Sequence, residues 1–388
     1  MTENRMVSPP LNRWEKSLFG VRFIRLPSLL PGLFAVGTLT LLSIWLSDFV
    51  GNGLLGFEKS PLSPVMIAIL LGLSISSVKP LPKTFAPGLK FAVKKLLKLG
   101  IILLGIRLTI FDVFRLGVFG VPIVIVCILG ALLITSQINK KLHLSPRLGA
   151  LIAVGTSICG VSAIVATSPA IDADEEESAY AVTVITIFGL FATLVYPYLT
   201  KMIFGGDALK VGLFLGTAIH DTSQVVGAAK IYADMFAQTL ALDVATVAKL
   251  VRNVFMVLVI PILTYMYARQ ADDDSQLQDN KILRLLPAFI LGFLGLAALR
   301  SIGDAGLNTG NAAFGLWPES IWSAIISEIK SIAEILFVVA LAAVGLGTNF
   351  HSIKALGIKP LIVGLAASLS VGLVSYLAIT LLGGLIAF

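Results

Sequence analysis

Long apolar segments separated by short polar loops run along almost the whole chain. Most of these segments hold about 20 residues, which is the length that a helix needs to cross the hydrocarbon core of a membrane. The pattern predicts about eleven membrane-spanning helices, at residues 30–49, 62–78, 88–111, 117–137, 147–168, 178–201, 208–230, 243–268, 282–300, 320–346 and 358–388. Glycines and polar residues interrupt two of them, 147–168 and 208–230. We expect these two to be broken helices near the middle of the membrane.

The composition supports this interpretation. Hydrophobic residues make up 57% of the 388 residues and charged residues 13%, whereas roughly 25% of a soluble domain is charged. We therefore predict an all-α polytopic membrane protein, with residues 30–388 as its transmembrane domain. Residues 1–29 have too much charge for a secretory signal. They are expected to form a cytoplasmic segment, either a disordered tail or a helix lying on the membrane surface.

The basic residues divide unequally between the two sides of the eleven predicted helices. With the N-terminus in the cytoplasm, 21 of the 29 Lys and Arg residues fall on the cytoplasmic side. Cytoplasmic loops of membrane proteins carry such an excess, so we predict the N-terminus inside and the C-terminus outside. The net charge of +7 then reflects topology. It gives no indication of nucleic-acid binding, because the basic residues are spread over short loops.

Two internal similarities predict inverted repeats, which are common in secondary transporters. The segment "PVMIAILLGL" (64–73) resembles "PAFILGFLGL" (287–296), and "GIRLTIFDVFRLG" (105–117) resembles "GLGTNFHSIKALG" (345–357). Each pair links helices that are seven apart, so the two copies run in opposite directions.

The two interrupted helices carry a third similarity, between "GTSICGVSAIVA" (155–166) and "GTAIHDTSQVVG" (216–227). With eleven spans these helices would run parallel and not inverted. Either a re-entrant segment is missing from the count, or the two motifs have converged on the same chemistry. The sequence leaves both explanations open.

The polar residues of the two interruptions are candidates for a substrate site. If helices restart at Val161 and Val225, two helix N-termini point into the protein centre, where their N–H groups and dipoles favour an anion. The alternative is that these small residues only permit close packing of helices. The candidate substrate-binding residues are Gly155, Thr156, Ser157, Cys159, Gly160, Ser162, Gly216, Thr217, Thr222, Ser223 and Gln224.

His220 and Asp221 are the candidate ion-coupling residues. An ionisable residue in the middle of a bilayer costs about 2.5–3.5 kcal/mol on insertion scales, and it usually marks a transport or proton path. Burial disfavours the charged form of a carboxyl group and a nearby cation favours it. We therefore expect Asp221 to couple H⁺ or Na⁺ to the substrate as the site opens to one side or the other. The alternative for Asp221 is a structural hydrogen bond to unwound backbone.

Lys249, Arg252 and Asn253 lie at spacings of three and four, hence on one face of a helix. They are candidates for attracting an anion into a cavity. The alternatives are pairing with Asp221 and extension of the basic side chains to the outer surface. Arg107, near a helix end, is expected at the membrane interface.

Enzymatic motifs are poorly represented. The sequence has no G-x-S-x-G, Walker A or HExxH motif, and its three histidines are too scattered for a metal triad. Cys159 and His220 occupy matching places in their motifs and form a weak candidate for a nucleophile and its base. We expect no enzyme activity, no cofactor and no metal, and the lack of a nucleotide-binding motif argues against a pump that itself uses ATP.

The segments "GTSICGVSAIVATSP", "GTAIHDTSQVVGAA", "KLVRN" and "AAVGLGTNF" resemble the signature segments of the YeiH-type family of proposed sulfate exporters of bacterial inner membranes. The resemblance runs from about residue 30 to the end of the chain. It implies a multi-spanning secondary carrier in the inner membrane, with sulfate or a related sulfur oxyanion as the exported substrate. The expected partners are this anion, H⁺ or Na⁺, the lipid bilayer and, as a candidate assembly, a second copy in a homodimer. The rival functions are a cation-coupled transporter of organic acids on the same scaffold and a membrane-embedded transferase or hydrolase.

Overall fold

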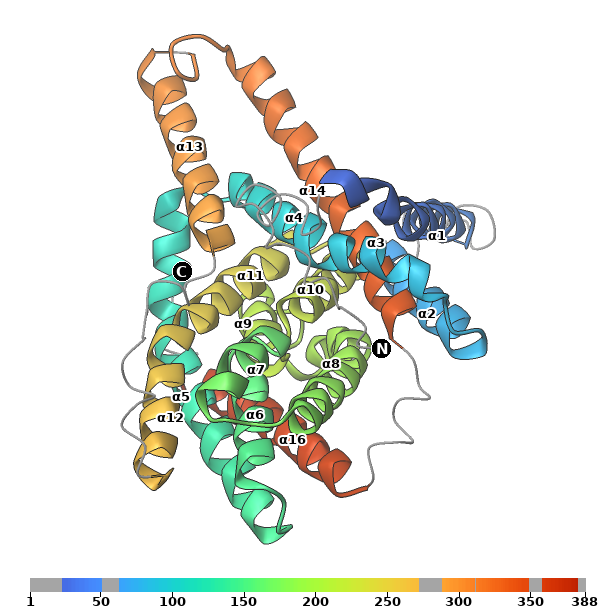
Figure 1. Cartoon of the computed structure of the whole chain (residues 1–388). Coiled ribbons are helices and arrows are strands. Elements are labelled where there is room, and N and C mark those ends of the chain that lie inside the picture. Colours follow the sequence, from blue (N-terminus) through green and yellow to red (C-terminus); the bar gives the residue numbers. More distant parts are fainter. Residues whose placement is uncertain (1–22, 51–62, 272–287, 311, 349–357, 383–388) are drawn as a thin grey trace.

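The computed structural model describes residues 23–50, 63–271, 288–310, 312–348 and 358–382 (Figure 1). This part of the chain is almost entirely helical, and its one extended pairing is an isolated bridge between Ala313 and Trp317. Most of the predicted N-terminal segment lies outside the described residues. Its last part, Phe23–Leu29, is a 3-10 helix that leads directly into the first long helix.

The helices follow the predicted apolar segments closely. They are α1 (Leu30–Asp48), α2 (Pro64–Val78), α3 (Ala86–Phe91), α4 (Leu97–Leu104), α5 (Ile110–Lys141), α6 (Pro146–Ser157), α7 (Val161–Thr167), α8 (Glu175–Ile203), α9 (Ala208–Ala218), α10 (Thr222–Phe236), α11 (Thr239–Val254), α12 (Met256–Ala271), α13 (Ala288–Gly310), α14 (Glu319–Gly347) and α16 (Ile358–Leu382). Short turns link several of them: η4 (Lys83–Phe85), η5 (Ala92–Leu96), η6 (Gly105–Arg107) and η7 (Ser168–Ala170).

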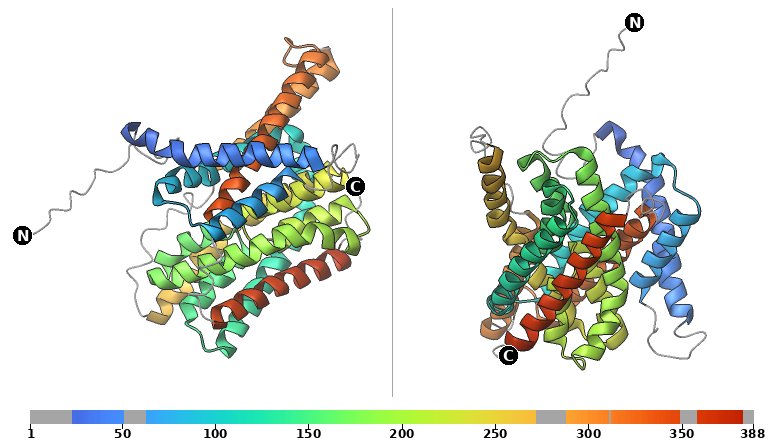
Figure 2. Two further views of the ribbon diagram at one scale, coloured as in Figure 1. Left: turned by 90° about the vertical axis from the view of Figure 1, so that its right-hand side faces the viewer. Right: turned by 90° about the horizontal axis from the view of Figure 1, so that it is seen from below.

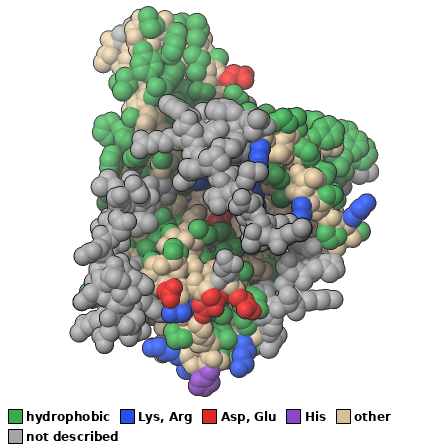
Figure 3. Space-filling model, in the orientation of Figure 1, with side chains coloured by type: hydrophobic (Ala, Val, Ile, Leu, Met, Phe, Trp, Pro, Cys, Tyr) green, Lys and Arg blue, Asp and Glu red, His purple; other side chains and the backbone are tan. Residues whose placement is uncertain are grey.

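The described helices have the properties of membrane spans. Seven of them are long and apolar enough to cross a bilayer by length and composition. Apolar side chains cover most of the described surface in Figure 3, and charged side chains gather at its lower end. The structure therefore confirms an all-α polytopic membrane protein, although it does not confirm the count of eleven crossings.

Helices α6 and α7 form a hairpin that returns to the face from which it came. The turn between them covers residues 158–160. A Cβ atom added to Gly155 would lie 2.8 Å from Cδ1 of Ile164, so the two arms pack side by side. At the open end of the hairpin, Ser145 before α6 donates a hydrogen bond to Glu177 at the start of α8.

Helices α9 and α10 form a second hairpin, whose turn covers residues 219–221. Its two arms also start and finish at one face. A Cβ atom added to Gly206, just before α9, would lie 3.7 Å from Nε2 of Gln238, which follows α10. The ammonium group of Lys201, at the end of α8, lies 5.3 Å from the ring centre of Phe236, the last residue of α10.

The two hairpins enter the protein from opposite ends. The 29-residue helix α8 begins beside the base of the first hairpin and ends beside the base of the second, a length of about 44 Å. The predicted interruptions of 147–168 and 208–230 are confirmed, but the prediction that these segments span the membrane was wrong. Because the first motif is re-entrant, the two Gly-Thr motifs enter in opposite directions, which answers the question that the sequence left open.

The hairpins and most of the other helices form two bundles. In Figure 1, α1, α2, α3, α4 and α14 lie on one side of the molecule, and α5 to α12 with α16 lie on the other, while α13 and α14 project beyond the rest. Figure 2 places α1 and α16 at opposite faces of the molecule, with the hairpins between them.

The two outer sequence similarities correspond to reciprocal contacts between helices. A Cβ atom added to Gly345 of α14 would lie 2.7 Å from the carbonyl oxygen of Ile69 in α2. A Cβ atom added to Gly105, the residue that matches Gly345, would lie 2.3 Å from the carbonyl oxygen of Phe293 in α13. The end of each copy's second helix thus packs closely on the first helix of the other copy, as expected for inverted repeats.

Candidate functional site

The tips of the two hairpins meet in the middle of the molecule. Gly160 in the first tip has φ +70°, and a Cβ atom at this position would lie 3.0 Å from the Cα of Asp221 in the second tip. Non-helical backbone at membrane depth persists only where it is buried in protein or lines a water-filled cavity. The contact between the two tips is therefore the candidate functional site.

Glycine is required at position 160 both by its backbone conformation and by this contact. We expect Gly160→Ala to destabilise the protein by about 1–3 kcal/mol, because a Cβ atom there is both strained and too close to the second tip. The melting temperature of the purified protein in detergent measures the effect. Gly205→Ala is the matched control, since Gly205 has φ +61° but no atom within 4 Å of an added Cβ. Equal melting temperatures for the two variants would contradict the close contact.

Lys249 of α11 ties the two tips together. Its side chain is fully buried. Nζ donates hydrogen bonds to the carbonyl oxygens of Ile158 (2.9 Å) and Ile219 (3.2 Å), and to that of His220. All three donors of the ammonium group are therefore used by backbone from both hairpins.

Arg252, one turn further along α11, binds the ends of the two entering helices. It is also fully buried. Nε donates to the carbonyl oxygen of Ser157 (3.0 Å) and Nη2 to that of Thr156 (2.5 Å), both in the last turn of α6. Nη1 donates to the carbonyl oxygens of Thr217 (2.6 Å) and Ile219 (2.9 Å) at the end of α9, with a longer contact of 3.2 Å to Gly216.

These contacts explain why two cations are buried at the centre. The last carbonyl groups of a helix have no partners inside the helix and carry a partial negative charge. Lys249 and Arg252 supply donors and positive charge to two such ends at once. The structure agrees with the predicted shared helix face, and the role of these side chains in attracting an anion stays a prediction. In the described residues, both basic groups are buried and bind backbone carbonyl groups, in place of an ion pair with Asp221 or a position on the outer surface.

Asn253 lies next to Arg252 and faces the start of α10. Its Nδ2 atom donates to Oγ1 of Thr222 at 3.3 Å. The side-chain oxygen of Asn253 and the hydroxyl group of Thr156 are both buried, and neither has a hydrogen-bond partner in the described part of the chain. A ligand that entered the centre would find unused hydrogen-bonding capacity at these two groups.

Asp221 caps the second arm of its own hairpin. Oδ1 accepts hydrogen bonds from the backbone N–H of Ser223 (2.9 Å) and from its hydroxyl group (2.6 Å). Gln224 completes the cap, since its Oε1 accepts from the N–H of Asp221 at 3.1 Å. Its Nε2 donates to the carbonyl oxygen of Thr186 in α8. The alternative of a structural hydrogen bond thus describes part of what Asp221 does, and helix α10 begins at Thr222 and not at Val225 as predicted.

The predicted hydroxyl groups do not all converge. Thr156 and Ser223 are buried at the tips, whereas Ser162 is exposed and the hydroxyl of Ser157 lies 3.4 Å from the carbonyl oxygen of Val154 in its own helix. Thr217 shares a hydrogen bond of 2.6 Å with Ser375 of α16. Helix α7 begins at Val161 as predicted, and its cap residue Gly160 offers no side chain to the first N–H groups. The substrate-binding role of these residues stays a prediction.

Cys159 and His220 do not form a reactive pair. The thiol of Cys159 is buried and lies 3.6 Å from the sulfur of Met256. Nε2 of His220 lies 3.1 Å from the hydroxyl of Ser368 in α16. In the residues that the structure describes, no group of His, Cys, Asp and Glu side chains could hold a metal ion.

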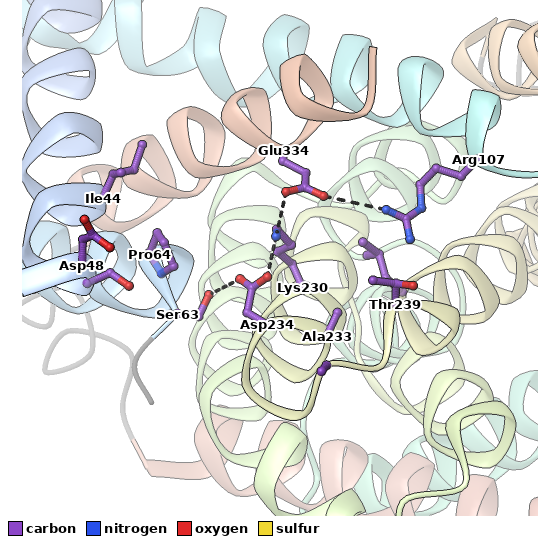
Figure 4. Close-up of a pocket in the computed structure, with 13 residues that line it drawn as sticks. Ile44, Asp48, Ser63, Pro64, Arg107, Lys230, Ala233, Asp234, Thr239 and Glu334 are labelled. Atoms are coloured by element: carbon purple, nitrogen blue, oxygen red, sulfur yellow. Dashed lines mark hydrogen bonds and ion pairs between the residues drawn. The ribbon is translucent and has the colours of Figure 1, made fainter. Parts of the chain in front are cut away.

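A cavity of about 600 Å³ separates the two bundles beside the base of the second hairpin (Figure 4). Charged residues line this cavity, and two of them, Lys230 and Asp234, were missed by the sequence interpretation. Lys230 pairs with Asp234 (2.5 Å) and Glu334 (3.1 Å). Arg107 was expected at the membrane interface, but its side chain is only 9% exposed and pairs with Asp243 at 2.6 Å. The signal available in the sequence was the presence of Lys230 and Asp234, four positions apart, within an otherwise apolar segment.

Comparisons with known proteins identify relatives along almost the whole chain. The model of the family described as "Conserved hypothetical protein 698" matches residues 31–364. A UPF0324 membrane protein of Streptococcus pneumoniae serotype 4 is 33% identical over 348 residues, covering 89% of this chain and 97% of the relative. A UPF0324 membrane protein of Clostridium tetani is 30% identical over 363 residues, covering 91% and 97%.

A solved structure of the sodium proton antiporter MjNhaP1 from Methanocaldococcus jannaschii aligns with 92% of this chain and all of its own. The identity is 14% and the TM-score is 0.27, which is too low to support an argument about function. The family match and the two relatives carry the assignment, and they agree with the resemblance noted in the signature segments. The chain belongs to the conserved hypothetical protein 698 family of multi-spanning membrane proteins.

Proposed function

We propose that the protein is a secondary active transporter of a small anion, coupled to H⁺ or Na⁺, and not an enzyme. The observation that carries this proposal is the meeting of two re-entrant hairpins from opposite faces at half the depth of the protein. Discontinuous helices of this kind place helix ends and unwound backbone at the midplane, where transporters bind substrates and coupling ions. The base of each hairpin lies at one face of the protein, and its tip lies at the central point that the two hairpins share.

The charge at the centre favours an anion. Each helix end counts as roughly half an elementary charge. On this count the C-terminal ends of α6 and α9 together carry about one negative charge. They therefore offset one of the two positive charges of Lys249 and Arg252. The two N-terminal ends, of α7 and α10, are offset by Asp221. An excess of about one positive charge remains, which a small anion would neutralise.

Asp221 supplies the coupling in this proposal. Its carboxylate occupies the N-terminus of α10 and lies beside Gly160, the residue before α7, where an added Cβ atom would be 3.0 Å from Oδ2. An ionised Asp221 therefore competes with an anionic substrate for the same positive field. Binding of H⁺ or Na⁺ to the carboxylate removes this competition, so that the anion and the coupling ion bind together.

The topology proposed here has the N-terminus in the cytoplasm and the bases of the two hairpins on opposite sides. Moving residues 201–210 to the outside lowers the number of basic residues on the cytoplasmic side from 21 to 19 of 29, so the positive-inside bias persists. The bacterial inner membrane follows as the proposed location.

Counterflow in proteoliposomes tests the function. Vesicles containing the purified protein would be loaded with unlabelled sulfate, sulfite, phosphate or a dicarboxylate, and diluted into the same labelled compound. A carrier gives transient accumulation of unchanged label for at least one of these anions, and empty liposomes do not. Chemical conversion of the label without accumulation would favour a membrane-embedded enzyme.

A further inference from the structure

The cavity between the two bundles holds a carboxylate shared by two basic side chains. Oε2 of Glu334 lies 3.1 Å from Nζ of Lys230, and Oε1 lies 3.8 Å from Nη1 of Arg107 (Figure 4). Two oxygens on one carbon thus bridge two cations. The same arrangement would suit any small oxyanion that presents two oxygens on one central atom.

Each cation has a second acidic partner that holds it in place. Asp234 binds Lys230 at 2.5 Å within α10 and is itself fixed by a hydrogen bond of 2.7 Å from Ser63, the residue before α2. Asp243 of α11 binds Arg107 at 2.6 Å. The side chains of Lys230 and Arg107 are only 12% and 9% exposed. The two cations would therefore keep their positions if Glu334 moved away.

Glu334 is the exposed member of this network. Its side chain is 39% exposed, more than any of its partners, and it comes from α14 of the opposite bundle. Because Glu334 lines the cavity and is the most exposed of the three side chains, its carboxylate can return to water when an anion takes its place beside the two cations. The contact of Glu334 with Lys230 of α10 also links the two bundles across the cavity.

We propose that Arg107 and Lys230 form an outer binding site for a small oxyanion, and that Glu334 occupies this site in the absence of the anion. The inference rests on the proposed function, since the anion bound here is the one carried through the centre. Entry of the anion displaces Glu334 and releases α14 from the hairpin bundle at this face. Glu334 therefore competes with the anion for this site and holds α14 against the hairpin bundle until an anion binds.

Binding of radiolabelled sulfate and phosphate to the full-length protein in nanodiscs tests this site. Glu334→Gln should tighten binding of at least one of the two anions by about fivefold, and Lys230→Gln should weaken it by a similar factor. In the double variant, the gain from Glu334→Gln should largely disappear, because the competitor acts through Lys230. Glu328→Gln is the matched control, since Glu328 is an exposed residue of the same helix; its affinity should equal that of the unmodified protein.

Two results would overturn the inference. If the unmodified protein binds and exchanges the anion while Glu334→Gln leaves its affinity unchanged, the outer site is refuted and the transport function stands. An equal gain in Glu334→Gln whether or not Lys230 is present would also refute the competition. If no anion in the counterflow panel is exchanged and neither sulfate nor phosphate binds, the proposed function fails together with the outer site.

Discussion

Replacing Arg252 by methionine is expected to destabilise the folded protein by about 3–5 kcal/mol, because removing a charged partner from buried polar groups is strongly destabilising. The change leaves carbonyl groups from the ends of both α6 and α9 without donors in a dry environment. Since a domain is stable by only about 5–15 kcal/mol, much of the protein should unfold or fail to reach the membrane. Thermal unfolding and size-exclusion profiles in detergent measure the loss.

Lys210→Met is the control for this substitution. Lys210 is a basic residue at the start of α9 whose side chain is 42% exposed and pairs with the nearby Asp207 at 3.2 Å. Its replacement should change the melting temperature little. Arg252→Lys should fall between the two, because an ammonium group keeps the charge but offers three donors instead of five. An Arg252→Met protein as stable as Lys210→Met would show that the hairpin ends do not depend on this cation.

Asp221→Asn is expected to abolish accumulation of the substrate against its gradient and to spare exchange at least in part. The amide group can still accept hydrogen bonds at the start of α10, but it cannot change its charge. Exchange requires only that the site reaches both sides, whereas accumulation requires a coupling ion to bind and leave. Uptake and efflux in vesicles with an imposed pH or Na⁺ gradient measure the first activity, and counterflow measures the second.

The control for this substitution is Asp207→Asn, since Asp207 caps α9 through its side chain in the same way but lies at the base of the hairpin. It should transport normally. Full gradient-driven transport by Asp221→Asn would show that the carboxylate has only a structural role as a helix cap.

The sequence was informative about the position of each helix, but it could not show whether an interrupted segment crosses the membrane or turns back. Hydrophobic length alone placed the apolar segments, because the cost of exposing backbone to lipid forces each one to be helical. An interrupted segment of about 20 residues has the same composition whether it crosses the membrane or returns. The first segment returns because its two arms pack on each other, as Ile164 does beside Gly155, and because its two ends meet at Ser145 and Glu177. No periodicity in the sequence reports such contacts.

The binding partners of the central charged residues could not be predicted from the sequence either. The spacing of Lys249 and Arg252 correctly placed both on one face of α11. Their partners are backbone carbonyl groups, which every residue possesses and no sequence pattern marks. Glu334 and Lys230 are 104 positions apart, so their pairing depends on how the two bundles pack. The sequence could identify the unusual charges but not what they bind.

Side-specific labelling of single cysteines tests most directly the claim that two hairpins enter from opposite faces and meet at the centre. The positions are His143→Cys and Asp172→Cys, on either side of α6 and α7, and Gly205→Cys and Ala237→Cys, on either side of α9 and α10. The two native cysteines are buried and give a low background. A membrane-impermeant maleimide would be applied to vesicles of each orientation. We predict that 143 and 172 label from one side, and that 205 and 237 both label from the other. Labelling of 143 and 172 from opposite sides would mean that the first motif spans the membrane, and the proposed transport centre would be wrong.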